Sequence, residues 1–294
     1  MYLKKTIALM LTLSIAFSFG ACNKAEEKPE TLVSTDEATN LLNSAHEKMP
    51  LIESYAGGIN LEFKFTNNEG DLEAEVFTDV LRADTGIMHI EIETVAEGTV
   101  LGNSEFYVGV VEGSDERGLY MFYDEQWFQS KSNVEELYYL LGHYDLPDIT
   151  RIFLTAASGA SVVGEETIDG EKVTRIDAVV GEDFIANTLI FTGVFVATGM
   201  GTITEEYFNG ATAMPISFWI DKDNNVVKLA FDAGPAYQTI SDNLFDMVKD
   251  LEGYEDAQKL VVNTYAFELN MKNIGDENSI EIPQSALDGE LLDQ

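Results

Sequence analysis

The residue with the most specific chemistry in this chain is Cys22, its only cysteine. Lys4 and Lys5 precede an uncharged stretch over residues 6–19, and Gly20 and Ala21 stand directly before the thiol. A basic start, a short apolar run and small residues before a cut are typical of a secretory signal peptide. A cysteine at the cut forms a lipobox, whose thiol receives acyl chains such as palmitate. We therefore predict a lipoprotein signal peptide over residues 1–21 and a lipid anchor at Cys22.

Other chemistry-bearing patterns are weak. The histidines His46, His89 and His143 have no zinc-like partner at helical spacing. Residues 221–232 begin like a calcium loop, but Val226 stands where glycine is needed and the bidentate glutamate is absent. No nucleophile elbow, phosphate-binding loop or dinucleotide fingerprint occurs in the sequence. We therefore predict a hairpin turn at Asp221, no metal, no cofactor and no enzymatic activity.

The net charge of −35 comes from 52 acidic and 17 basic residues. Such a surface repels the phosphate backbone of nucleic acids, which excludes that class of partner. It also repels anionic lipid headgroups, so attachment to a membrane must come from the acyl chains. We predict a protein anchored to a bacterial membrane on its extracytoplasmic side, at the cell surface or in the periplasm. No pattern identifies a protein partner.

The elements that would position a site follow from hydrophobic spacing. Residues 22–35 are polar and indicate a flexible, acidic tether. Apolar residues at every second position predict antiparallel strands, and apolar residues spaced three or four positions apart predict helices. The expected strands lie at 59–65, 72–76, 88–92, 106–110, 119–128, 161–180, 215–232 and 260–271, and the expected helices at 36–49, 134–141, 149–156 and 239–251. This pattern predicts an α+β fold, with residues 36–294 as a single domain.

One segment does not fit an acidic surface, because residues 184–200 carry no charge. An element that is apolar on every side must be buried on every side or face lipid. It is either a central core element or the lining of an apolar cavity. Its candidate lining residues are Ile185, Leu189, Phe191 and Phe195.

The aromatic residues offer a further possibility. Trp127 and Trp219, together with Tyr138, Tyr139 and Tyr144, could form a platform on which sugars stack, although aromatic residues at such spacings are commonly core residues.

Several stretches together resemble lipoproteins of the LolA-like and LppX-type lipid-carrier superfamily. The resemblance rests on the hairpin at 119–128, the hairpin at 164–178, the strand and turn that begin at Pro215, and a closing strand at 280–283. It implies a curved antiparallel sheet, an open half-barrel, closed over by a few helices. In that family the cavity carries acyl chains, and no catalytic residues are involved.

The sequence and this resemblance favour an exported binding protein that holds a lipid or another amphiphile in an apolar cavity. The residues expected to line the cavity are Phe63, Phe65, Ile185, Leu189, Phe191, Phe195 and Trp219. Two alternatives remain open. One is a cell-surface interaction or sensor lipoprotein whose core is filled by its own side chains, and the other is a carbohydrate-binding lipoprotein.

Overall fold

The computed structural model describes residues 35–68, 70–110, 117–123, 125–132, 142–251 and 258–292. The predicted signal peptide, Cys22 and all of the tether except Thr35 lie outside these residues, as does the helix predicted at 134–141.

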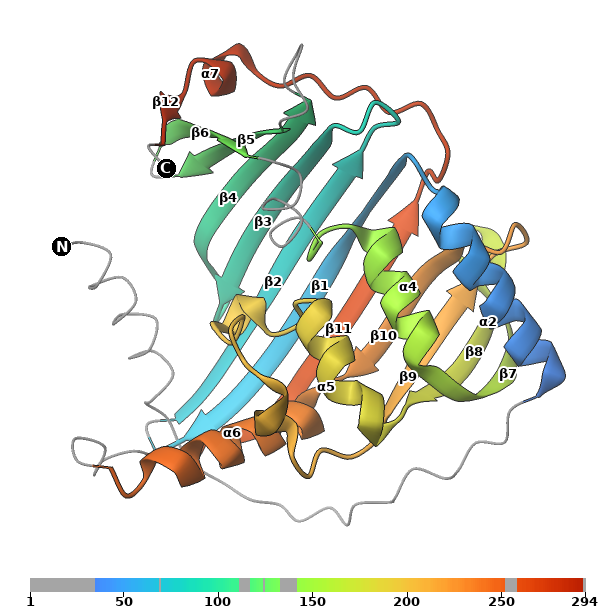
Figure 1. The fold of residues 1–294 in the computed structure, drawn as a ribbon, viewed down its shortest axis with the longest axis vertical. Helices are drawn as coiled ribbons and strands as arrows, with labels where there is room; N and C mark the ends of the chain where they lie inside the picture. Colours follow the sequence, from blue (N-terminus) through green and yellow to red (C-terminus); the bar gives the residue numbers. More distant parts are fainter. Residues whose placement is uncertain are drawn as a thin grey trace.

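A single twelve-stranded sheet organises the described chain (Figure 1). Its order is β12-β6-β5-β4-β3-β2-β1-β11-β10-β9-β8-β7, and every neighbouring pair is antiparallel except β12 with β6. The strands are β1 (Tyr55–Asn67), β2 (Gly70–Arg82), β3 (Met88–Ala96), β4 (Thr99–Val110), β5 (Arg117–Tyr123), β6 (Gln126–Ser132), β7 (Ala157–Ile168), β8 (Glu171–Val180), β9 (Met214–Ile220), β10 (Val226–Asp232), β11 (Val261–Lys272) and β12 (Glu290–Leu291).

The predicted α+β open half-barrel is confirmed, because the edge strands β12 and β7 do not pair and the sheet stays open. Alternation along each strand decides which face is covered. In β1, for example, Leu61, Phe63 and Phe65 are buried in the core, whereas Glu62 and Lys64 between them are exposed or half-buried. We call the face that carries the core residues the inner face, and the opposite one the outer face.

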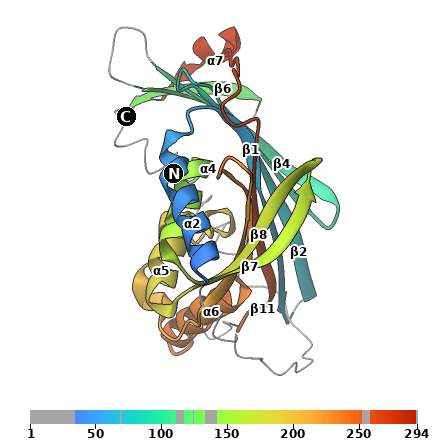
Figure 2. The ribbon, with the colours of Figure 1, turned by 90° about the vertical axis from the view of Figure 1, so that its right-hand side faces the viewer.

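Helices cover the inner face over β1 and β7–β11 (Figures 1 and 2). They are α2 (Asp36–Lys48), η1 (Met49–Leu51), α4 (Leu146–Ala156), α5 (Glu182–Phe191), η2 (Val196–Thr198), η3 (Glu205–Phe208) and α6 (Gly234–Val248). Helix α2 begins at the cap Thr35, whose hydroxyl accepts a hydrogen bond from the amide of Ala38 at 3.2 Å. Within the described residues, no helix is long and apolar enough to cross a bilayer.

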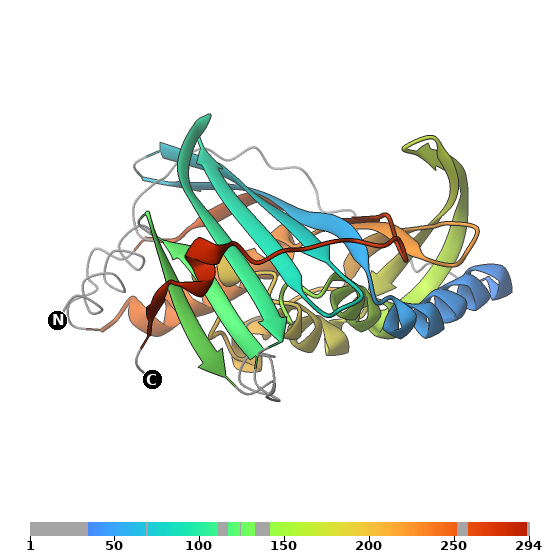
Figure 3. The same cartoon turned by 90° about the horizontal axis from the view of Figure 1, so that it is seen from above.

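The chain after β11 runs to the far edge of the sheet and packs on its outer face (Figure 3). Ile280 and Ile282 pack against Tyr107 and Tyr120, which point away from the inner face, and α7 (Gln284–Leu287) follows. The strand predicted at 280–283 is therefore wrong: those residues pack through their side chains, and the closing strand is β12.

Candidate functional site

A cavity of about 150 Å³ lies between the sheet and its cover. Its floor is the inner face of four neighbouring strands, β3, β2, β1 and β11, and its cover is the chain at 192–197 with the turn before α4. It is lined by Ile59, Leu61, Val76, Thr78, Ile92, Thr94, His143, Tyr144, Thr192, Gly193, Val194, Val196, Ala197 and Phe267.

Of the residues that the structure describes, no carboxylate, lysine or arginine lines this cavity, although the chain carries a net charge of −35. The polar groups are threonine hydroxyls, the imidazole of His143 and the phenol of Tyr144. Burial lowers the pKa of His143 below the ordinary value of 6.5 and raises the pKa of Tyr144, so both side chains are held neutral. The cavity is therefore suited to an uncharged, mainly apolar group.

The cover approaches His143 closely at one glycine. Gly193 has a φ of +67°, and a Cβ there would lie 2.4 Å from Cγ of the His143 ring. Only glycine adopts this backbone conformation freely and leaves room for the ring. The contact between 192–197 and the turn before α4 thus depends on the absence of a side chain at Gly193.

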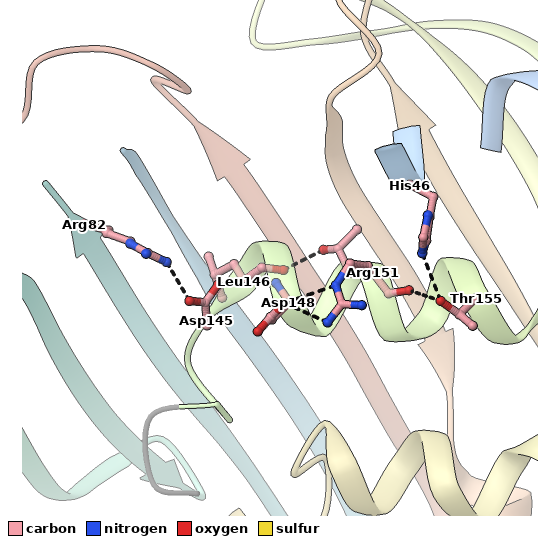
Figure 4. Close-up of polar contacts among 8 residues, drawn as sticks. His46, Arg82, Asp145, Leu146, Asp148, Arg151 and Thr155 are labelled. Carbon is pink, nitrogen blue, oxygen red and sulfur yellow. Dashed lines mark hydrogen bonds and ion pairs between the residues drawn. The ribbon is translucent and has the colours of Figure 1, made fainter. Parts of the chain in front are cut away.

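The turn that carries His143 is fixed where α4 begins (Figure 4). Asp145 caps the helix by accepting a hydrogen bond from the amide of Asp148 at 3.3 Å, and Nη1 of Arg82 lies 2.5 Å from its other oxygen. Burial raises the pKa of Asp145, and the guanidinium of Arg82 opposes that shift. The hydroxyl of Tyr55 accepts a hydrogen bond from the amide of Leu146 at 3.2 Å, which ties the same turn to β1.

The residues predicted to line the cavity lie elsewhere. Phe63, Phe65 and Phe195 form a buried aromatic cluster with Tyr237 and Tyr265, in which neighbouring ring centroids lie 4.9–6.3 Å apart. This cluster fills the part of the interior next to the cavity. The side chains of Ile185 and Leu189, both on α5, are also buried in the core.

Phe191 and Trp219 do not face the interior. The Phe191 side chain is 63% exposed at the end of α5. Trp219 alternates with the core residues Phe218 and Ile220, so it points to the outer face. There its Nε1 donates a hydrogen bond to Glu166 at 2.7 Å, and Arg175 and Lys228 lie over its ring.

Two of the predicted segments nevertheless contribute to the lining of the cavity. Strand β1 contributes Ile59 and Leu61 rather than the phenylalanines, and the uncharged segment contributes Val194 and Val196. The rings of Phe63 and Phe65 fill the space around them, whereas a cavity forms where neighbouring side chains are too small to do so. The alternation in β1 placed both pairs on one face and could not separate them.

The predicted turn at Asp221 is confirmed. Residues 221–225 join β9 to β10, and Oδ1 of Asp221 accepts hydrogen bonds from the amides of Asp223 and Asn225, both at 2.8 Å. Trp127 and Trp219 do not form one platform, because they lie on β6 and β9, which are separated by seven strands. Tyr138 and Tyr139 lie outside the described residues.

No family model and no curated protein matches the sequence. Among solved structures, the fold is similar to that of LprF from Mycobacterium bovis, with 13% identity over 86% of this chain and 99% of that chain and a TM-score of 0.45. It is also similar to lipoprotein LppX from Mycobacterium tuberculosis, with 13% identity over 84% of this chain and 100% of that chain and a TM-score of 0.41.

A domain from Vibrio parahaemolyticus, assigned as an outer-membrane lipoprotein-sorting protein, is similar with 10% identity over 85% of this chain and 98% of that chain and a TM-score of 0.23. Solved structures of both kinds that the sequence resembles are therefore similar to this chain in fold. These likenesses concern the fold, and the function is argued from the cavity itself.

Proposed function

We propose that this chain is an exported, lipid-anchored protein that binds an amphiphile in the cavity between β1–β3, β11 and residues 192–197. The observation that carries the proposal is that none of the described residues lining the cavity is charged, in a chain of net charge −35. Burying a charge without a partner is costly, whereas apolar surface gains about 25 cal/mol for each Å² removed from water. The apolar part of the ligand enters, and its polar group stays near His143, Tyr144 and the threonines.

The size of the cavity limits what it can take as it stands. A volume of about 150 Å³ is sufficient for a benzene-sized group, so a full acyl chain requires the cover to move. The cover runs from the end of α5 into η2, and Tyr265 holds it by donating a hydrogen bond to the carbonyl of Val194 at 2.9 Å. Displacing residues 192–197 would extend the cavity toward the aromatic cluster.

The lipid anchor determines where the protein acts. Acylated Cys22 holds the domain at the extracytoplasmic face of a bacterial membrane, where the amphiphile is available. Binding is passive, with no cofactor and no catalytic residue. It follows that the protein takes up or presents a lipid and does not modify it.

The competing function is a cell-surface interaction or sensor protein without cargo. The aromatic cluster favours it, because Phe63, Phe65, Phe195, Tyr237 and Tyr265 fill much of the interior that a long chain would occupy. Uptake of a ligand separates the two functions.

The test is a titration of the purified protein with cis-parinaric acid, a fatty acid whose fluorescence rises in apolar surroundings. We expect saturable binding at one site. Ile92→Asn places an amide in the cavity and should weaken binding at least tenfold. Val95→Asn makes a comparable change on the outer face of the same strand and should leave binding unchanged. Equal effects of both variants, or no saturable binding, would favour the protein without cargo.

A further inference from the structure

The outer face of the sheet carries a second feature, unrelated to the apolar cavity. A groove of about 1010 Å³ runs across strands β1–β4, β11 and β10 beneath the tip of the β7–β8 hairpin, which curls over this face in Figure 3. Its ionisable lining is mainly acidic, with Asp79, Glu91, Glu93, Glu105 and Asp169 set against Lys228 and Lys272.

Three side chains at this groove converge on one point. His89 and Glu91 are two residues apart on β3 and therefore share the outer face, and Glu105 on β4 stands directly opposite Glu91. Nε2 of His89 lies 3.0 Å from Oε1 of Glu105 and 3.4 Å from Oε1 of Glu91. One ligand atom from each residue lies within 4.8 Å of the other two, a spacing that a single metal ion can bridge.

The electrostatics at this point favour a cation. Asp79 on β2 is directly opposite Glu91, so carboxylates stand side by side on three adjacent strands. Like charges directly opposite each other destabilise a sheet. Among the described residues, no lysine or arginine forms an ion pair with these carboxylates, and His89 is the basic side chain that reaches Glu91 and Glu105.

The donors are also held in place by a neighbouring side chain. The ring of Tyr107 stacks on that of His89, with centroids 4.2 Å apart and planes 15° from parallel. The Tyr107 hydroxyl donates a hydrogen bond to Oε1 of Glu105 at 2.9 Å. Such supporting contacts orient ligands in metal sites and reduce the cost of ordering them on binding.

We propose that His89, Glu91 and Glu105 bind one divalent first-row transition-metal ion, with Zn²⁺ as the representative. An imidazole nitrogen combined with carboxylate oxygens suits Zn²⁺ and its neighbours, whereas Ca²⁺ is bound by oxygen ligands alone. Three protein ligands leave one coordination position open toward the groove, where water or an anionic group of a ligand can bind. The site is independent of the amphiphile cavity, since it lies on the opposite face of the sheet.

The test is isothermal titration of the purified protein with Zn²⁺ after removal of metals by EDTA. We expect one equivalent to bind, and His89→Gln and Glu105→Gln each to weaken binding about tenfold or more. Glu93→Gln is the matched control, because it removes one carboxylate from the same face of β3 outside the site. Its affinity should stay within about twofold of the parent. Circular dichroism checks that all variants are folded.

A second variant and a second metal make the test sharper. Tyr107→Phe keeps the stacked ring and removes the hydrogen bond to Glu105, so Zn²⁺ affinity should fall by about tenfold. Co²⁺ should give visible absorption bands that are lost in His89→Gln. The proposal is overturned if Glu93→Gln weakens binding as much as Glu105→Gln, if His89→Gln binds Zn²⁺ normally, or if the parent protein does not bind Zn²⁺.

Discussion

Replacing Thr78 with isoleucine should stabilise the protein and weaken ligand binding, two effects of opposite sign. Thr78 lies on β2, is buried, and faces the cavity between Ile59 and Ile92 on the neighbouring strands. Isoleucine is also β-branched and suits a strand. The longer side chain would project into space that already exists, so it requires no movement of the surrounding core.

The size of the stabilisation follows from the atoms added. Thr78→Ile replaces a hydroxyl with a methylene and adds a methyl group, and each buried carbon contributes about 0.8 kcal/mol. Ordering the longer side chain costs about 0.5 kcal/mol. The net gain should be about 1 kcal/mol, which raises the Tm of a domain of this size by about 2–4 °C. Binding should weaken at least tenfold, because the added carbons occupy the ligand's place.

The assay combines thermal unfolding with the cis-parinaric acid titration on the same samples. Thr78→Val is the matched control, because it removes the hydroxyl at nearly constant shape and leaves the cavity volume unchanged. It should bind the probe like the parent. A Thr78→Ile variant that is stabilised yet binds the probe with an unchanged Kd would refute the placement of the ligand in this cavity, and a destabilised variant would refute the existence of the space.

Three further predictions concern the cover of the cavity. Gly193→Ala should lower the free energy of unfolding by about 2 kcal/mol and weaken probe binding, because it combines a positive φ with a clash against His143. Gly199→Ala is the control, because φ there is +79° but the space around it is open. It should lower the free energy of unfolding by about 1 kcal/mol and leave binding intact. Burial lowers the pKa of His143, so unfolding takes up a proton as the pH falls through 6.5. Denaturant melts should therefore show that the free energy of unfolding falls more steeply below pH 6.5 in the parent than in His143→Gln. Above that pH the two plots of unfolding free energy against pH should be parallel. Parallel plots over the whole pH range would contradict this. Arg82→Met should destabilise the protein by about 1–3 kcal/mol, because it leaves the half-buried Asp145 without its partner. Adding Asp145→Asn should recover much of this loss. If the stability losses of the two single variants simply add in the double variant, the ion pair does not contribute.

The sheet could be predicted from the sequence because alternation is a local signal. The hairpins at 161–180 and 215–232 carry both the period of two and recognisable turn residues, and they match β7–β8 and β9–β10. The helix predicted from 239 begins earlier, at Gly234, because Pro235 is tolerated in a first helical turn. The segment at 280–283 alternates like a strand, yet its partner is a row of tyrosine rings rather than a backbone edge.

The candidate sites depend on information that a single strand does not contain. Ile59 and Phe63 lie on the same face of β1, and only the packing of the aromatic cluster shows which of them borders empty space. The histidines have no metal-binding partner at helical spacing, whereas His89, Glu91 and Glu105 converge through strand spacing and cross-strand register. The pattern His-x-Glu within a strand was visible in the sequence, but its pairing with Glu105 was not.

The most direct test of the account is native mass spectrometry of the purified protein, followed by organic extraction of anything bound. We expect an added mass that corresponds to one amphiphile, retained while the protein is folded and released on unfolding. The same measurement on Thr78→Ile should give the bare chain. A bare mass for the parent protein, which persists after incubation with fatty acid and phospholipid, would contradict the central claim and leave a surface protein with a filled core.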